Sequence, residues 1–149
     1  MRVDIYERKP EGFALEMEVA VCYLEWLGAL LMLRQSPGKS EPGTWGLPGG
    51  KFELGEAGAV CARRELFEET GILVDPAKIL FLETLYIRKP RWSFAYHMFQ
   101  ILLEEKPEVR LSDEHEEYLW ADSEKRKTIP LIAGTVETIQ RYERLKKRI

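Results

Sequence analysis

Three glutamates on one side of a predicted helix are the strongest indication of chemistry in this sequence. A helix is expected over Ala57–Thr70, and at about 100° per residue Glu65, Glu68 and Glu69 share an arc of roughly 100°. Like charges at this spacing repel one another unless a cation lies among them. Because carboxylate oxygens suit hard divalent ions, the pattern indicates either a Mg²⁺ or Mn²⁺ site or a solvated acidic face.

The residues around these glutamates favour the metal site. Gly49 and Gly50 lie just upstream, where the missing Cβ lets the backbone approach a ligand or a metal and present a carbonyl oxygen. Glu56 begins the helix, where the positive end of the helix dipole favours a negative charge. Arg64 stands beside the acidic face and could pair with Glu65 or Glu56, although a surface salt bridge would give the same pattern.

The other side of this helix is expected to pack on the core, and Gly71 is placed as its C-terminal stop. The residues assigned to the packing side are Ala59, Val60, Ala62, Leu66 and Phe67. Short apolar runs before and after the helix predict strands over residues 17–24, 28–34, 79–87, 93–103 and 118–121. A second helix is expected over Leu131–Lys147, and the connection Gln35–Trp45 is long enough to suggest a functional loop. These elements predict an α/β fold, with helices packed on a sheet.

The composition limits the class of protein. At 149 residues the chain is expected to be a single domain, residues 1–149, since domains usually have roughly 100–200 residues. A net charge of −3 argues against a nucleic-acid polymer or an anionic membrane as partner, because both need a basic surface. The sequence has no apolar run near the roughly 20 residues of a membrane span, and its charged N-terminus does not resemble a signal peptide. We therefore expect a cytoplasmic location.

The cysteines and histidines are not predicted to be metal ligands. Cys22 and Cys61 lack metal-ligand spacing and are expected to be small core or edge residues in a reducing compartment. His97 lies in an apolar strand and is expected to be a hydrogen-bonded core residue. His115 could titrate near the metals, but it is not among the predicted site residues.

The residues around the acidic helix resemble the Nudix box, Gly-x5-Glu-x7-Arg-Glu-U-x-Glu-Glu-x-Gly-U, where U is a bulky aliphatic residue. The match runs from Gly50 to Ile72 without a departure. Seen with the order of the strands, the resemblance implies a Nudix fold with a mixed β-sheet sandwiched between helices (α/β/α). It further implies a hydrolase that cleaves a nucleoside diphosphate linked to another group, with Mg²⁺ or Mn²⁺ as cofactor, and a monomer or homodimer.

The resemblance also implies roles for individual residues. The metal ligands would be Gly50, through its carbonyl, and Glu65, Glu68 and Glu69. Arg64 would orient Glu65, and Glu56 would assist from the start of the helix through contacts outside the ligand shell. An acidic helix can become a pyrophosphate site in this way, because bridging metals offset its repulsion of the anion.

A general base is needed to accept a proton from the attacking water. In the branch of the family that cleaves nucleoside triphosphates, a glutamate from the loop before the last strand reaches the metals, and the matching residue here is Glu114. A solvated acidic loop is the alternative reading of this position. Glu116, Glu65 and Glu68 remain open as other candidates for the base.

Other residues are candidates for contacts with the substrate. Arg34 and Lys51 could bind phosphate. Trp45, Trp92 and Phe94 could stack on a base, or they could pack in the core or at its rim.

The resemblance favours a MutT-like nucleoside triphosphate pyrophosphohydrolase, on residues 45–53 and on the spacing of Glu114 and Trp120. The asparagine with which 8-oxoguanine-selective enzymes read the purine is missing, since the sequence contains no asparagine. Hydrolysis of ADP-ribose, other nucleotide sugars or dinucleoside polyphosphates is the alternative, and Pro90 lies somewhat late for the ADP-ribose branch. A Nudix module that binds nucleotides without cleaving them is the alternative of another class.

Overall fold

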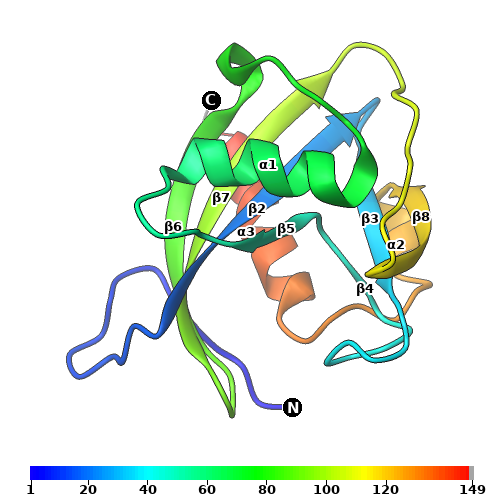
Figure 1. Ribbon diagram of the computed structural model, residues 1–149. Helices are drawn as coiled ribbons and strands as arrows, with labels where there is room; N and C mark the ends of the chain where they lie inside the picture. The colour runs from blue at the N-terminus through cyan, green and yellow to red at the C-terminus, as the bar shows by residue number, and fades with distance from the viewer. Residues whose placement is uncertain (148–149) are drawn as a thin grey trace.

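The apolar runs of the sequence form one mixed sheet in the computed structural model, which describes residues 1–147 (Figure 1). Its strands are β1 (Asp4–Tyr6), β2 (Met17–Trp26), β3 (Ala29–Gln35), β4 (Trp45–Gly46), β5 (Gly49–Lys51), β6 (Leu80–Arg88), β7 (Ser93–Leu103) and β8 (His115–Ala121). The order across the sheet is β1-β6-β7-β2-β3-β4, with β5 beside β2 and β8 beside β3. Strands β2 and β7 are parallel, and the other strand pairs are antiparallel.

Helices cover the sheet on both faces. They are α1 (Gly58–Thr70), a short α2 (Ser123–Arg126), α3 (Thr135–Lys146) and a 3₁₀ turn, η1 (Pro76–Lys78). Figure 1 shows α1 in front of the sheet and α3 behind it. The predicted α/β/α sandwich is therefore confirmed.

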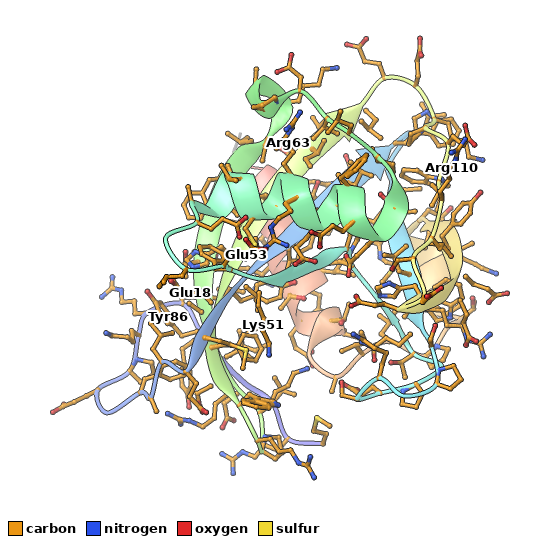
Figure 2. The ribbon with its side chains drawn as sticks, in the orientation of Figure 1. Glu18, Lys51, Glu53, Arg63, Tyr86 and Arg110 are labelled. Carbon is orange, nitrogen blue, oxygen red and sulfur yellow. The ribbon has the colours of Figure 1, made fainter. Side chains whose placement is uncertain are left out.

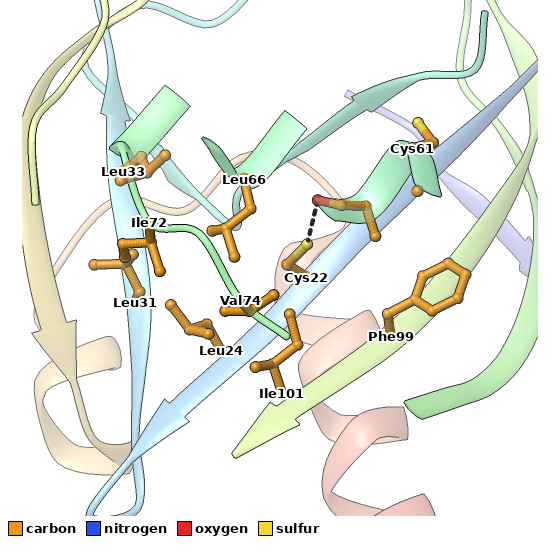
Figure 3. Packing of buried hydrophobic residues seen from close by; sticks show 12 residues of the cluster. Cys22, Leu24, Leu31, Leu33, Cys61, Leu66, Ile72, Val74, Phe99 and Ile101 are labelled. Carbon is orange, nitrogen blue, oxygen red and sulfur yellow. Dashed lines mark hydrogen bonds between the residues drawn. The ribbon is translucent and has the colours of Figure 1, made fainter. Parts of the chain in front are cut away.

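Strand β2 lies at the centre of the sandwich and supplies side chains to both layers. Cys22 and Leu24 pack in the cluster under α1, whereas Val21 and Tyr23 pack in the cluster under α3. This alternation follows from the two-residue period of a strand, and burial on both faces explains why β2 reads as an almost continuous apolar run. In the α1 cluster the Cys22 thiol also donates to the Ala62 carbonyl at 3.4 Å (Figure 3).

One edge of β2 is divided between two partners, and this division opens the space for a site. The first half of β2 pairs with β5 through Val19–Val21, whereas its end pairs with β3 through Glu25 and Trp26. The connection between β3 and β5 consequently leaves the sheet and returns to it. It returns as β5, which runs beneath α1 (Figure 1).

The second predicted helix begins later than expected. It starts at Thr135 instead of Leu131. The residues just before the helix instead form hydrogen bonds with the backbone of Trp45. The Trp45 carbonyl accepts from the Ile132 N–H at 2.9 Å, and the Trp45 N–H donates to the Pro130 carbonyl at 2.8 Å. Gly134 then adopts a φ of +94°, which ends the extended path before the helix can begin.

The face that α1 buries also differs from the prediction. Ala59, Val60 and Phe67 were assigned to the packing side, but all three are exposed, Val60 and Phe67 by 57% and 51%. The residues that are buried are Cys61, Ala62, Leu66, Glu69 and Thr70. The buried face is thus rotated toward the glutamates, because α1 packs against β2 and β5 together.

Leu66→Ala is expected to lower the free energy of unfolding by about 2–5 kcal/mol, because it deletes a fully buried side chain and leaves a cavity. Phe67→Ala, at the next position of the same helix, should change it by less than about 0.5 kcal/mol, as is usual for surface sites. Urea denaturation of the wild type and both variants measures the two changes in unfolding free energy. Equal losses would contradict the observed orientation of α1.

Candidate active site

A cavity of about 380 Å³ lies beneath α1, between the end of β3 and strand β5. Its walls are formed by Gln35, Lys39, Gly46, Leu47, Gly49, Gly50, Lys51, Glu65, Glu69, Glu114, His115 and Ile132. We call it the acidic cavity. It brings together five of the residues predicted from the sequence, namely Gly50, Lys51, Glu65, Glu69 and Glu114.

Glu69 is the most deeply buried carboxylate of this cavity. Only 5% of the residue is exposed, and one carboxylate oxygen accepts the Gly49 N–H at 2.8 Å. Burial, helped by the nearby Glu65 and Glu114 carboxylates and opposed by the Gly49 hydrogen bond, raises the pKa of Glu69 to about 8. A buried acid with acidic neighbours is a group whose charged form a bound cation would stabilise.

Glu114, at the end of the loop before β8, and His115, the first residue of β8, face Glu69. One ligand atom from each of these three residues lies within 4.8 Å of the others. The Lys39 ammonium is 3.8 Å from the Glu114 carboxylate. Burial lowers the pKa of the His115 imidazole, which favours its neutral form.

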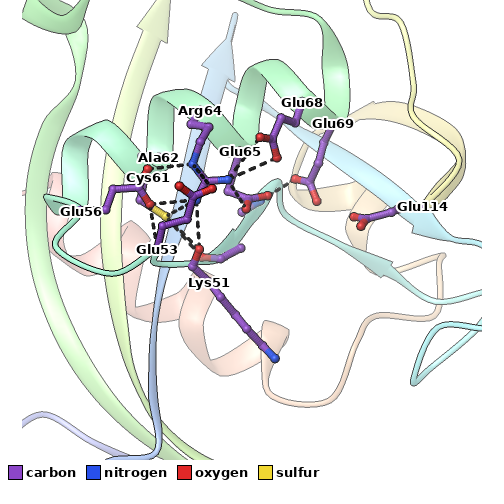
Figure 4. A network of polar contacts seen from close by, with 12 residues as sticks. Lys51, Glu53, Glu56, Cys61, Ala62, Arg64, Glu65, Glu68, Glu69 and Glu114 are labelled. Atoms are coloured by element: carbon purple, nitrogen blue, oxygen red, sulfur yellow. Dashed lines mark hydrogen bonds and ion pairs between the residues drawn. The ribbon is translucent and has the colours of Figure 1, made fainter.

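The Arg64 guanidinium organises the other side of the acidic face (Figure 4). It binds Glu56 in a bidentate pair at 2.7 and 2.8 Å and donates to Glu65 at 2.9 Å. It also donates to Glu68 at 3.3 Å and to the Lys51 carbonyl at 3.1 Å. The pKa of Glu56 falls to about 2, mainly because of the hydrogen bonds from Arg64. Arg64 therefore connects the start of α1, its acidic face and β5.

The two glycines of β5 are required by close approach. A Cβ on Gly50 would overlap the Glu65 carboxylate, and a Cβ on Gly49 would overlap the Ala20 carbonyl. Both positions therefore exclude side chains, and the carboxylates of α1 lie directly against the backbone of β5. This contact brings the carboxylates and the β5 backbone together in a set of oxygen donors that fits a divalent cation.

Four predicted residues lie outside the lining of the acidic cavity: Glu56 and Arg64, which form the network described above, and also Glu68 and Arg34. The Glu68 side chain is 54% exposed and contacts Arg64 on the solvent side of α1. Arg34 forms ion pairs with Glu116 at 3.3 Å and with Glu117 at 3.2 Å. Arg34, a predicted phosphate contact, and Glu116, a candidate base, are thus paired with each other.

A second cavity of about 570 Å³ adjoins the first, and Lys51 lines both. It lies beside the β6–β7 hairpin, and its walls include Met17, Val19, Glu41, Trp92 and Phe94. We call it the apolar cavity. The Lys51 ammonium is 5.6 Å from the centre of the Trp92 ring, and Figure 2 shows Lys51 between α1 and that hairpin. Trp45, by contrast, is a buried core residue.

Some features of the site were not predicted from the sequence. Lys39 and His115 line the acidic cavity, and the Gly49 N–H fixes Glu69. His115 could have been predicted, because it is adjacent in sequence to Glu114, a predicted site residue. Nothing in the spacing of Lys39 indicates its position, because a long loop separates it from the other residues of the site.

The chain belongs to the NUDIX domain family, whose model matches residues 16–141. It is thus a Nudix hydrolase, an enzyme that acts on pyrophosphate bonds, and the resemblance found in the box is confirmed at the level of the family. None of the helices within residues 1–147 has the length and apolar character needed to cross a bilayer.

Solved structures agree with this family. The chain is similar to the MutT protein from Methanosarcina mazei Go1, with 25% identity, a TM-score of 0.74 and coverage of 91% of this chain and 98% of that one. An Ap4A hydrolase binary complex from C. elegans has 23% identity, a TM-score of 0.69 and coverage of 89% and 99%. A bifunctional NMN adenylyltransferase/ADP ribose pyrophosphatase from Francisella tularensis, complexed with AMP and a Mn ion, has 21% identity, a TM-score of 0.69 and coverage of 87% and 41%. The latter two show a shared fold.

Glu56→Gln tests the Arg64 network through pH. The folded-state pKa of Glu56 is about 2, below its ordinary value of 4.5, so its ionisation stabilises the fold above about pH 4.5. This contribution is lost as the pH falls from about 4.5 toward 2. The difference in unfolding free energy between the wild type and Glu56→Gln should therefore shrink over this range. Denaturation series at several pH values measure it, and a difference that is independent of pH would contradict the pairing.

Proposed function

We propose that the chain is a metal-dependent nucleoside triphosphate pyrophosphohydrolase, which uses water to convert a nucleoside triphosphate to a nucleoside monophosphate and pyrophosphate. The observation that carries this proposal is the junction of the two cavities at Lys51. A carboxylate-lined space suits a metal-bridged polyphosphate, and the adjoining apolar space with an aromatic wall suits a nucleoside. Lys51, at the boundary, would contact a phosphate.

The donor set supports a divalent cation, and we propose Mg²⁺ or Mn²⁺. Glu65 and Glu69 would bind it inside the acidic cavity, together with the Gly50 carbonyl, and Glu68 would contribute from the solvent side of α1. When bound, the ion offsets the negative charge of the polyphosphate and makes water more acidic. Arg64 would orient Glu65, and Glu56 would hold Arg64 in place.

Glu114 is our proposed general base. Its carboxylate lines the acidic cavity, where it can accept a proton from the water that attacks phosphorus. Glu116 does not line this cavity and is paired with Arg34 at 3.3 Å, which favours Glu114 between these two. We still propose Arg34 as a phosphate contact, but the support for this role comes only from the sequence. In the structure its guanidinium is paired with Glu116 and Glu117.

The apolar cavity is the proposed site of the base. Trp92 and Phe94 present aromatic side chains to it, and an aromatic ring stacks on any base because every base has a π face. This arrangement supports a nucleotide substrate without selecting one base.

A panel of substrates tests the proposed reaction. Canonical, oxidised and methylated nucleoside triphosphates, ADP-ribose, dinucleoside polyphosphates and sugar nucleotides would be incubated with Mg²⁺ or with EDTA, and the products separated by chromatography. We expect monophosphate and pyrophosphate from triphosphates, and no product with EDTA. Preferential cleavage of ADP-ribose or a dinucleoside polyphosphate would move the assignment to those branches of the family. No cleavage of any compound, with binding retained, would favour a nucleotide-binding module.

Glu69→Gln should lower turnover by orders of magnitude, because it removes the charge of a proposed metal ligand. The amide oxygen can still accept the Gly49 N–H, so the fold should persist, and unfolding without metal should need at least as much denaturant as in the wild type. Steady-state kinetics and urea denaturation measure the two effects. Glu104→Gln, which changes an exposed carboxylate outside both cavities, is the matched control. Wild-type turnover in Glu69→Gln would refute the metal assignment.

A further inference from the structure

The two histidines of the sequence differ in the hydrogen bonding of their ring nitrogens. Both ring nitrogens of His97 are engaged, Nδ1 with the Thr84 hydroxyl at 2.7 Å and Nε2 with the Glu18 carboxylate at 2.9 Å. His115 is different, because its Nδ1 is buried and has no hydrogen-bond partner among residues 1–147. A buried ring nitrogen without a partner costs free energy unless something binds it.

The surroundings of His115 indicate what could bind there. Its imidazole lines the acidic cavity, and one of its ring nitrogens lies within 4.8 Å of carboxylate oxygens of Glu69 and Glu114. Three donors at this separation can converge on one ion. The Lys39 ammonium, 3.8 Å from Glu114, is a cation already drawn to this end of the cavity.

We propose that His115 is a metal ligand that holds a divalent cation together with Glu69 and Glu114. This position lies at the β8 end of the acidic cavity. The inference rests on the proposed function, because it assumes that the acidic cavity binds a metal ion. One carboxylate oxygen of Glu114 would contact the ion, which leaves the other free to accept a proton. The resulting nitrogen–oxygen donor set differs from the all-oxygen set around Gly50 and Glu65.

The nitrogen donor has a consequence for the choice of metal. Mg²⁺ prefers oxygen ligands, whereas imidazole binds transition-metal ions well. A site that includes His115 should therefore favour Mn²⁺ over Mg²⁺ relative to a site made of carboxylates alone. The loss of the imidazole should weaken binding of Mn²⁺ more than that of Mg²⁺.

Electron spin echo envelope modulation of bound Mn²⁺ tests the assignment, because it detects a nitrogen nucleus that is directly coordinated. The 149-residue chain with Mn²⁺ alone should show modulation from ¹⁴N. His97→Gln should retain this signal and His115→Gln should lose it, the same substitution being made at the only two histidines. In titrations, His115→Gln should lower the affinity for Mn²⁺ several-fold and the affinity for Mg²⁺ by less.

A labelling experiment avoids the substitution of His115. In the His97→Gln background, His115 is the only histidine, so incorporation of ¹⁵N-histidine should replace the ¹⁴N modulation with that of ¹⁵N. Bound Mn²⁺ without nitrogen modulation would overturn the inference and leave the carboxylate site of the proposed function intact. Failure to bind Mn²⁺ at all would overturn both.

Discussion

The bidentate pair between Arg64 and Glu56 is the interaction on which the geometry of the site depends. Without a cation among them, the glutamates of α1 would repel one another, and their side chains would spread into solvent. Arg64 also reaches the Lys51 carbonyl, so the same guanidinium joins the helix to β5. Because the guanidinium is planar and its donors are fixed in direction, it orients Glu65 as well as neutralising it.

The network leaves one carboxylate without a cationic partner, and that carboxylate lies deepest. Glu69 turns away from Arg64 and accepts a backbone N–H from Gly49 inside the cavity. Its raised pKa, about 8, shows that the folded chain alone does not compensate its charge. A protein that keeps such a group gives up some stability at this position, and a bound divalent ion would recover it. The carboxylates of α1 and its start therefore fall into two groups: those paired with Arg64, and Glu69, which has no ion pair among the described residues.

Local pattern was enough to predict the central elements and the placing of Glu65, Glu68 and Glu69 along one side of α1. The period of the apolar residues predicted the strands on both sides of the box, and Gly71, with a φ of +72°, does end α1. The local pattern did not predict elements whose structure depends on pairing with a segment far away in the sequence. Strand β1 exists because it pairs with β6, and the segment before α3 is extended because it pairs with Trp45. Similarly, the burial of Glu69 instead of Phe67 follows from the position of β5 under the helix.

The same distinction between local and distant determinants applies to the site. The box residues were predictable because one helix and one short strand place them at fixed offsets. Glu114 reaches the cavity from the loop before β8, and His115 reaches it as the first residue of β8. Their positions depend on the pairing of β8 with β3 and on the hydrogen bond from the Ser112 N–H to the Glu69 backbone carbonyl. That bond joins the loop to the end of α1. The two walls of the acidic cavity are thus far apart in sequence, and this backbone hydrogen bond connects them at the C-terminal end of α1.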